Sequence, residues 1–267
     1  MQHRLLGKTD LRVSEIAFGG AEIGLPYGHG VKSEADMISE RDAIALLHES
    51  LEAGITFFDT ARLYGLSEAR MGQAFRDRRQ RVVLATKSAH FRNDDGSIPA
   101  LTVLRARVEA SLTASLAALQ TDYVDLFMLH SSDQVLLENG DVLRVFVIQL
   151  PFNLMDQRQE AVFAEAVRLG VGLVVRSVLL RGLLTEKGRN LHPALAAVER
   201  HLGTYQALLG EAAPDLPTLA TRFALSFPEV TSILVGIDHP DYLRRSLAAA
   251  NGRYFDASRL DRAKALA

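Results

Sequence analysis

Short apolar runs alternate along the chain with segments in which apolar residues recur at helical spacing. Runs of four to eight apolar residues rich in Val, Ile and Phe are typical of buried strands. Seven runs meet this description, at 16–19, 55–59, 82–86, 123–129, 146–150, 172–178 and 232–236. Helical spacing is found between them, after Ser39 and near 67–76, 101–119, 133–143, 157–168, 192–209 and 217–226, with two further helices at the carboxyl end.

This alternation predicts an α/β fold with parallel strands and right-handed crossovers. We expect a single domain over residues 1–267, a TIM-type (β/α)8 barrel, because the chain has no internal repeat or linker. A closed barrel of this type requires eight strands, one more than the sequence supplies. An open doubly wound sheet is the weaker alternative, since AFGGAEIG after the first strand lacks the GxGxxG spacing.

Local signals add detail to this outline. The opening RLLGKTDLRVS predicts two short extended pieces around the turn GKTD, and a glycine-rich loop, GLPYGHGVKSEAD, is long enough to lie over a site. Ser39 with Asp42 has the spacing of a helix N-cap and its partner, and the helix that follows is expected to stop at Gly54. In the long helix 101–119 the expected buried stripe is formed by Leu104, Val108, Leu112, Ser115 and Leu119.

Composition narrows the possible functions. Hydrophobic residues make up 48% of the chain and charged residues 23%, which predicts a full globular core. A net charge of −2 offers no basic surface for nucleic acid, and no apolar run approaches the roughly 20 residues that cross a bilayer. The start MQHRLLGKTD does not resemble a signal peptide and cysteine is absent, so we expect a cytoplasmic protein. The histidines lack HxxxH or HExxH spacing, so we expect no metal site.

Four residues able to hold or move a proton stand at or just beyond the ends of predicted strands. ITFFDT ends with Asp59 and is followed by Tyr64, VVLATK ends with Lys87, and YVDLFMLH ends with His130. Each has an ordinary explanation by itself, as a turn cap, a turn aromatic, an exposed strand end or a core histidine. The carboxyl ends of barrel strands gather at one face, where barrel enzymes hold their catalytic groups. The four residues together therefore predict a site.

These side chains suit proton transfer coupled to hydride transfer. A free tyrosine titrates near pH 10, and a neighbouring ammonium lowers that pKa because it favours the phenolate. Tyr64 is therefore the expected acid, Lys87 the cation that tunes it and Asp59 the partner that holds Lys87. A neutral His130 can donate a hydrogen bond to a substrate carbonyl oxygen. No obvious nucleophile is present, so the hydride is expected from a cofactor.

At these residues the chain resembles the aldo-keto reductase family, which uses an Asp, Tyr, Lys and His tetrad in a (β/α)8 barrel. FFDTARLYG, ATK and TDYVDLFMLH are similar to the segments that carry the tetrad. RLLGKTDLRVSEIAFGG, IQLPFNLMD and SILVGIDHPDYLRRSLAAA extend the similarity along almost the whole chain. The resemblance implies an NAD(P)-dependent oxidoreductase that interconverts a carbonyl and an alcohol on a small substrate, a sugar or an aldehyde. It also implies NADP or NAD bound extended across the barrel mouth.

The same resemblance implies which residues hold the cofactor. Gln149 would face the carboxamide, and Arg176 stands where the family has a ring-stacking aromatic. Ser177, Leu179 and Gly182 would line the pyrophosphate path. The other implied cofactor contacts are Gly20, Asp59, Gly236, Ile237, Asp238, Tyr242, Arg245 and Ser246.

One departure from the family concerns the barrel. The family has a helix, a strand ending in a GVSN-like motif and a second helix between its LH and IQLPFN segments, and this βα unit is lacking here between Leu143 and Val145. Either the natural protein has a stretch that this sequence omits, or the unit is deleted. A deletion would expose two unpaired strand edges and promote aggregation or rearrangement.

A second departure concerns the cofactor. NADP-preferring members place Lys, Ser and Arg where this chain has Gly236, Ile237 and Tyr242, so a 2′-phosphate finds no cation at these positions. Asp238 would repel that phosphate, whereas the nearby Arg244 and Arg245 would attract it. The sequence therefore does not decide whether the cofactor is NAD or NADP.

Three functions follow as hypotheses. The leading one is an oxidoreductase that uses Tyr64. The alternative is a non-catalytic barrel that binds a dinucleotide or a partner protein, because the GVSN-like segment is absent. A weaker third hypothesis is a hydrolase or lyase that uses Asp59 and His130. The sequence contains no metal-ligand spacing that would support it.

Overall fold

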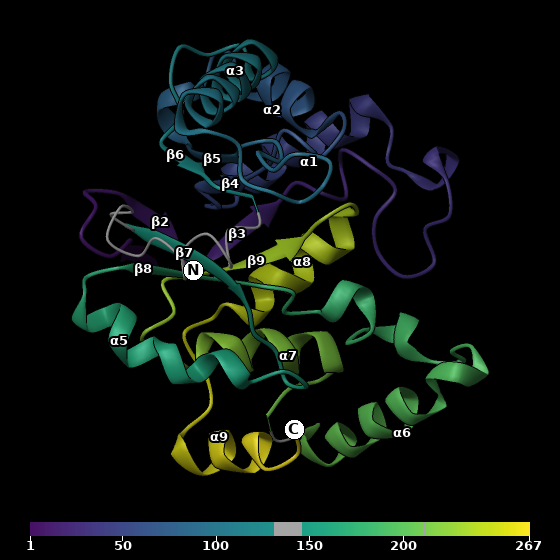
Figure 1. Cartoon of the computed structure of the whole chain (residues 1–267). Coiled ribbons are helices and arrows are strands. Elements are labelled where there is room, and N and C mark those ends of the chain that lie inside the picture. Colours follow the sequence, from purple (N-terminus) through teal and green to yellow (C-terminus); the bar gives the residue numbers. More distant parts are fainter. Residues whose placement is uncertain (131–145, 211) are drawn as a thin grey trace.

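The computed structural model describes residues 1–130, 146–210 and 212–267, and its centre is a sheet of parallel strands (Figure 1). The strands are β3 (Ile16–Gly19), β4 (Phe57–Asp59), β5 (Val83–Lys87), β6 (Leu126–Met128), β7 (Val147–Pro151), β8 (Gly172–Arg176) and β9 (Ser232–Gly236). They form one 7-stranded sheet in the order β6-β5-β4-β3-β9-β8-β7. The predicted α/β fold is thus confirmed as a TIM-like barrel of parallel strands that is open on one side.

The opening lies where the sequence lacks a βα unit. β6 pairs with β5 and β7 pairs with β8, and within the described ranges neither strand has a partner on its other side. Residues 131–145 connect these two strands in the chain, so the helix expected over 133–143 and the position of the lacking unit lie outside the described residues. The seven predicted strands are all found, and the eighth is absent from the described sheet.

Side chains of the parallel strands alternate between an outer and an inner apolar cluster, as the two-residue period of a strand requires. The outer cluster packs under the helices and includes Ile16, Phe58, Leu84, Val175 and Ile233. The inner cluster fills the barrel and includes Ala17, Phe57, Ala85, Val174 and Leu234. Because both faces of each strand are covered, the strands read in the sequence as continuous apolar runs.

An antiparallel hairpin closes the amino-terminal end of the barrel. It consists of β1 (His3–Leu5) and β2 (Arg12–Ser14), which are the two extended pieces predicted around GKTD. Leu6 and Val13 from this hairpin belong to the inner cluster. The Ser14 amide donates to Thr56 Oγ1 at 3.1 Å, just before β4. The amino-terminal end of the barrel is therefore filled.

Helices surround the sheet. The α-helices are α1 (Glu40–Glu52), α2 (Ser67–Phe75), α3 (Leu101–Leu119), α5 (Phe163–Arg168), α6 (Ala196–Thr204), α7 (Leu216–Leu225), α8 (Pro240–Ala249) and α9 (Ala257–Lys264). Figure 1 shows α1, α2 and α3 grouped on one side of the sheet and α5, α7 and α9 on the other. The predicted cap of α1 is confirmed, since Ser39 Oγ accepts a hydrogen bond from the Asp42 amide at 3.1 Å.

Short 3-10 helices occur in the connections. They are Glu34–Asp36, Arg79–Arg81, Arg158–Val162, Leu180–Gly182, Glu186–Gly188, Pro193–Leu195 and Tyr205–Leu208. The segment predicted as helical near 192–209 is therefore built from α6 and a 3-10 turn on each side of it.

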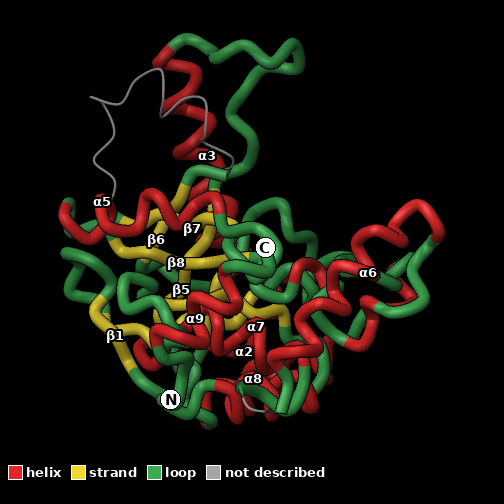
Figure 2. Tube along the Cα trace, turned by 90° about the horizontal axis from the view of Figure 1, so that it is seen from below, coloured by secondary structure: helices red, strands yellow, loops and turns green. Residues whose placement is uncertain are grey.

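Helix α3 has the predicted bounds, and its predicted stripe is fully buried only toward the carboxyl-terminal end. Ser115 and Leu119 are buried, whereas Leu104, Val108 and Leu112 are partly exposed. Figure 2 shows α3 and the loop before it projecting from the rest of the molecule. α3 follows β5, close to the open edge, so the first half of the helix has no neighbouring helix to pack against in the described part of the chain.

Candidate active site

One residue from each parallel strand forms the floor of the barrel mouth. Each lies two positions beyond a residue that fills the barrel, so its side chain also points inward, one layer higher. This floor consists of Gly19, Asp59, Lys87, Met128, Gln149, Arg176 and Gly236. All seven line one cavity of about 1330 Å³. The apolar pattern of the strands therefore determines which polar residues meet in the cavity.

A buried ion pair occupies one side of the floor. Lys87 Nζ lies 2.6 Å from Asp59 Oδ2 and also donates to the Thr60 carbonyl at 2.9 Å. The other carboxylate oxygen, Asp59 Oδ1, accepts a hydrogen bond from Gln149 Nε2 at 2.9 Å. Strands β4, β5 and β7 are thereby joined through one carboxylate, and both of its oxygens are engaged.

Tyr64 and His130 stand over this ion pair, so the structure brings the four predicted residues together. Lys87 Nζ lies 4.8 Å from the centre of the Tyr64 ring. The rings of Tyr64 and His130 meet edge to face with their centres 5.6 Å apart. His130 Nδ1 is buried and has no hydrogen-bond partner among the described residues. Tyr64, which is half-buried, and His130 both line the cavity.

The charges around Tyr64 differ from the prediction. Burial raises the pKa of Tyr64 and the Asp59 carboxylate raises it further, while Arg176 lowers it. The lowering expected from Lys87 is outweighed by burial, and the Lys87 charge is balanced by Asp59 at 2.6 Å. Burial in turn lowers the pKa of Lys87, against the pull of Asp59. Arg176 is a second cation near Tyr64 that favours the phenolate.

His130 is held in its neutral form. Burial lowers the pKa of His130, and the charges of Lys87 and His90 lower it further. His90, which the sequence did not single out, stacks on His130 with ring centres 5.8 Å apart. A neutral imidazole has one N–H to donate, which suits it to hold an oxygen rather than to attract an anion.

The cavity extends from these residues along β8 and β9 to α8. The implied cofactor residues that line it, besides those of the floor, are Gly20, Ser177, Leu179, Gly182, Asp238, Tyr242, Arg245 and Ser246. Ile237 does not line the cavity, since its side chain is fully buried in the outer cluster. The side chain of Ile237 points to the opposite face of the strand end, and the expected cofactor contact at this residue stays a prediction.

The shape of this cavity fits an extended dinucleotide. Gly19 and Gly236 are paired in register on adjacent strands, so the floor there has no side chains. A β carbon at Gly236 would come within 2.0 Å of Glu22 Oε1, which places that carboxyl group directly over the glycine. The floor at Gly19 can receive a planar ring, and the Gln149 amide on the same floor can bind a polar substituent of that ring.

Glu22 is a site residue that sequence analysis missed. Burial raises the pKa of Glu22 to about 7, and the charges of Asp238 and Asp59 add to this effect, while Lys187 opposes it. The available signal was an acidic residue directly after the glycine pair that ends the first barrel strand, in GGAEIG. The carboxyl group thus stands in the cavity close to its change of charge at neutral pH.

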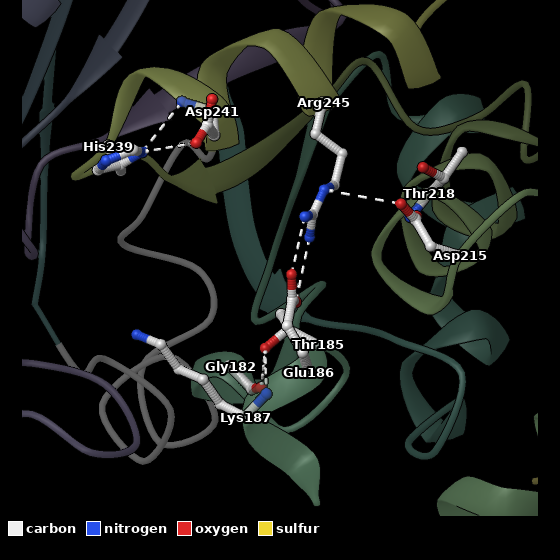
Figure 3. A network of polar contacts seen from close by, with 9 residues as sticks. All are labelled: Gly182, Thr185, Glu186, Lys187, Asp215, Thr218, His239, Asp241 and Arg245. Atoms are coloured by element: carbon white, nitrogen blue, oxygen red, sulfur yellow. Dashed lines mark hydrogen bonds and ion pairs between the residues drawn. The ribbon is translucent and has the colours of Figure 1, made fainter.

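At the far end of the cavity, two carboxylates hold Arg245 (Figure 3). Arg245 of α8 contacts Glu186 at 2.8 Å and Asp215 at 3.7 Å. Arg244 is paired with Asp241 one turn earlier. The two arginines expected to attract a 2′-phosphate therefore already have anionic partners. In the part of the chain that the structure describes, no cluster of side chains could hold a metal ion, and no helix could span a membrane.

Comparison with known proteins agrees with this geometry. The model of the Aldo/keto reductase family matches residues 15–137 and 134–267. The chain belongs to the aldo/keto reductase family. It is accordingly an oxidoreductase of a family whose members typically depend on NAD(P)H and act on small molecules. The two matched segments meet at 134–137, within the stretch that connects β6 and β7.

Individual relatives cover nearly all of the chain. YqkF, an uncharacterized oxidoreductase of Bacillus subtilis (strain 168), is 28% identical over 300 residues, covering 95% of this chain and 92% of the relative. L-galactose dehydrogenase of Arabidopsis thaliana is 27% identical, covering 92% and 87%. The holo form of aldo-keto reductase AKR11C1 from Bacillus halodurans matches with a TM-score of 0.80 at 26% identity, covering 100% of this chain and 96% of that chain.

The YqkF comparison also shows how many aligned positions have no residue in this aldo/keto reductase. Because 95% of 267 residues is about 254, about 46 of the 300 aligned positions face a gap in this chain. A strand with a crossover helix and its loops has about this length. The comparison therefore supports the lack of one βα unit.

Proposed function

We propose that this aldo/keto reductase interconverts a carbonyl and an alcohol on a small substrate, with Tyr64 as the acid and base and a nicotinamide dinucleotide as the hydride carrier. The observation that carries this proposal is the placement of Tyr64 and neutral His130 over the buried Asp59–Lys87 pair, at the end of a long cavity. A sugar or an aldehyde is the proposed substrate, in keeping with the sugar named for the Arabidopsis relative.

The proton steps follow from the pKa directions. Burial keeps Tyr64 a neutral phenol, so in reduction its hydroxyl donates the proton to the substrate oxygen. His130 donates a second hydrogen bond to that oxygen and orients the carbonyl. Lys87, 4.8 Å from the Tyr64 ring, stabilises the phenolate that forms. When bound, the nicotinamide ring supplies the hydride in reduction or accepts it in oxidation.

The cavity residues divide between the two ends of the cofactor. The Gln149 amide, already fixed by Asp59, would bind the carboxamide. Ser177, Leu179 and Gly182 would follow the pyrophosphate, and Tyr242 and Ser246 the adenosine. We propose NAD as the preferred cofactor, because Arg244 and Arg245 are paired with carboxylates and Asp238 would repel a 2′-phosphate.

Replacement of Tyr64 tests the proposal. In Tyr64→Phe we expect kcat to fall by about 100-fold or more, since general acid catalysis contributes about 10²–10⁴-fold. The dissociation constant of NADH, measured by fluorescence titration, should stay within about twofold. Tyr123→Phe is the matched control, because Tyr123 lies against Arg79 and is not among the residues that line the cavity. Its kcat should be unchanged.

Three results would argue against the proposal. Undiminished turnover in Tyr64→Phe would exclude Tyr64 as the acid. Tight NADH binding without turnover of any carbonyl in a broad panel would favour the non-catalytic barrel. Turnover without any dinucleotide would favour a hydrolase or lyase.

A further inference from the structure

Arg176 is the floor cation that lacks a counterion. Its guanidinium donates to Ser177 Oγ at 3.2 Å, and no carboxylate lies within ion-pair distance of it among the described residues. The other two ionisable floor residues, Asp59 and Lys87, neutralise each other. Arg245, at the far end of the same cavity, is held by Glu186 and Asp215. The floor of the barrel mouth therefore carries a net positive charge, and this charge is located at Arg176.

This charge reaches the groups that would perform the reaction. Arg176 lowers the pKa values of Tyr64, Lys87 and His130, which surround the reacting end of the cavity. Arg176 lies on β8 two residues after Val174, which belongs to the inner cluster. The Arg176 side chain therefore points into the mouth of the barrel. Arg176 is exposed to the cavity rather than buried in the wall.

The position of a bound nicotinamide ring follows from the proposed function, on which this inference rests. Hydride transfer requires the reacting carbons to be about 3–3.5 Å apart, so the ring must lie beside a carbonyl held by Tyr64 and His130. Tyr64 and His130 occupy the side of the floor above Lys87 and Met128. On the other side of the floor, Gly19 and Gly236 have no side chains, although the Glu22 carboxyl group lies over Gly236, and β8 with Arg176 pairs directly with β9. A ring beside that carbonyl lies within reach of the Arg176 charge, which acts on both Tyr64 and His130.

We propose that Arg176 makes this site bind reduced nicotinamide more tightly than oxidised nicotinamide and thereby favours oxidation of an alcohol. The oxidised ring carries a positive charge, and the reduced ring is neutral. In oxidation the hydrogen on the alcohol carbon leaves with both electrons of its bond and enters the ring, which loses its charge. The hydroxyl proton goes to the Tyr64 phenolate, so the alcohol becomes a carbonyl. Arg176 favours the hydride transfer, since it disfavours a cationic ring, and it raises the fraction of Tyr64 that is phenolate before the proton is transferred.

Direct binding measurements test the proposal without relying on turnover. The dissociation constants of NADH and NAD⁺ are measured by calorimetry for the wild type, Arg176→Gln, Arg176→Lys and Arg181→Gln. Two like charges a few ångströms apart in a partly solvated cleft shift such an equilibrium by about tenfold. In Arg176→Gln we therefore expect the ratio of the NAD⁺ to the NADH constant to fall about tenfold, chiefly through tighter NAD⁺ binding. Arg176→Lys should retain most of the wild-type ratio.

Arg181→Gln is the matched control, because Arg181 lies in the loop after β8, over the ring of Tyr27, and lines the same cavity. Its ratio should equal that of the wild type. Equal weakening of both cofactor forms in Arg176→Gln would overturn the proposal, since it would place the guanidinium on the phosphates common to both. An unchanged ratio would overturn it as well.

Failure of the proposed function gives a different result. If the wild type binds neither NADH nor NAD⁺, the nicotinamide assignment itself is excluded. Arg176→Met serves as a second neutral variant if Arg176→Gln does not fold, and far-UV circular dichroism checks the fold of each variant before binding is measured.

Discussion

Gln149 of β7 donates a hydrogen bond to Asp59 of β4 across the mouth of the barrel, with Nε2 2.9 Å from Oδ1. These two strands are not neighbours in the sheet, and they lie on opposite sides of the β3–β9 pair. A single side-chain contact therefore links the parts of the sheet that the opening separates, and it also completes the hydrogen bonding of the buried carboxylate.

Gln149→Leu should weaken both the fold and cofactor binding. The loss of one hydrogen bond to a buried carboxylate lowers the free energy of unfolding by about 1–3 kcal/mol. Urea denaturation measures this change, and fluorescence titration should show weaker NADH binding because the carboxamide loses its partner. Gln159→Leu provides the control, since Gln159 lines the same cavity without a described hydrogen bond. Equal stability of the two variants would contradict the prediction.

Lys87→Met should be more damaging, because it leaves the Asp59 charge buried without its cation. Removal of one partner from a buried ion pair destabilises proteins by about 3–5 kcal/mol. The double variant Asp59→Asn with Lys87→Met removes both charges and should recover at least half of that loss in urea denaturation. Turnover should be lost in both variants. If the double variant were as unstable as Lys87→Met, packing rather than the unpaired charge would explain the effect.

Glu22 should make the stability of the protein depend on pH. The folded protein keeps the Glu22 proton up to about pH 7, whereas the unfolded chain releases it near 4.5. Between these values the unfolded state binds fewer protons, so the free energy of unfolding falls as the pH rises and levels off above pH 7. For this half-buried group we expect a contribution of about 1–3 kcal/mol. Urea denaturation at pH 5 and pH 8 measures it.

Glu22→Gln supplies the comparison for that experiment. The amide cannot ionise, so the difference in stability between pH 5 and pH 8 should shrink by the Glu22 contribution. The variant should also bind NADH with less dependence on pH, because no carboxylate forms over Gly236 in the cavity that would hold the cofactor. Identical pH profiles for wild type and variant would show that Glu22 does not titrate in this range.

The carboxylates around Arg245 should control the choice between NADH and NADPH. In Glu186→Gln with Asp215→Asn, both anionic partners of Arg245 become neutral, and the freed guanidinium can attract a 2′-phosphate. We expect NADPH affinity to rise about three- to tenfold relative to NADH, as measured by fluorescence titration. Asparagine retains the N-cap that Asp215 forms with the Thr218 amide at 2.8 Å.

A distant acidic residue controls for the change in total charge. Glu165→Gln in α5 removes the partner of Arg168 and should leave the ratio of NADPH to NADH affinity unchanged. If the ratio also failed to respond in the Glu186 and Asp215 variant, Arg245 would be excluded as the determinant of cofactor choice.

Much of the fold and the site could be predicted because the deciding information is local. Strands buried on both faces appear as apolar runs, and the residues that end them, Asp59 and Lys87, are fixed at the barrel mouth by the two-residue period. Tyr64 and His130 follow such runs within a few residues. The strand count also predicted that the barrel is incomplete, and the sheet is open between β6 and β7.

The remainder depends on contacts that no local pattern contains. Glu22 lies in a glycine-rich loop, and only the folded chain places its carboxyl group over Gly236. The pKa of Tyr64 depends on whether Lys87 is free or paired, which spacing does not reveal. The amino-terminal half of α3 has an apolar stripe in its sequence, but burial of that stripe requires a neighbour beside the open edge.

The open edge divides the described sheet into two arms that are joined at one place. Each strand of a closed barrel is braced from both sides, whereas here the arm β4–β6 and the arm β7–β8 are connected through the central pair of β3 and β9. Tyr64, Asp59 and Lys87 belong to the first arm, and Gln149 and Arg176 belong to the second. In the proposed reaction, the alignment of Tyr64 with the groups that would hold the hydride carrier therefore depends on the spacing of the two arms.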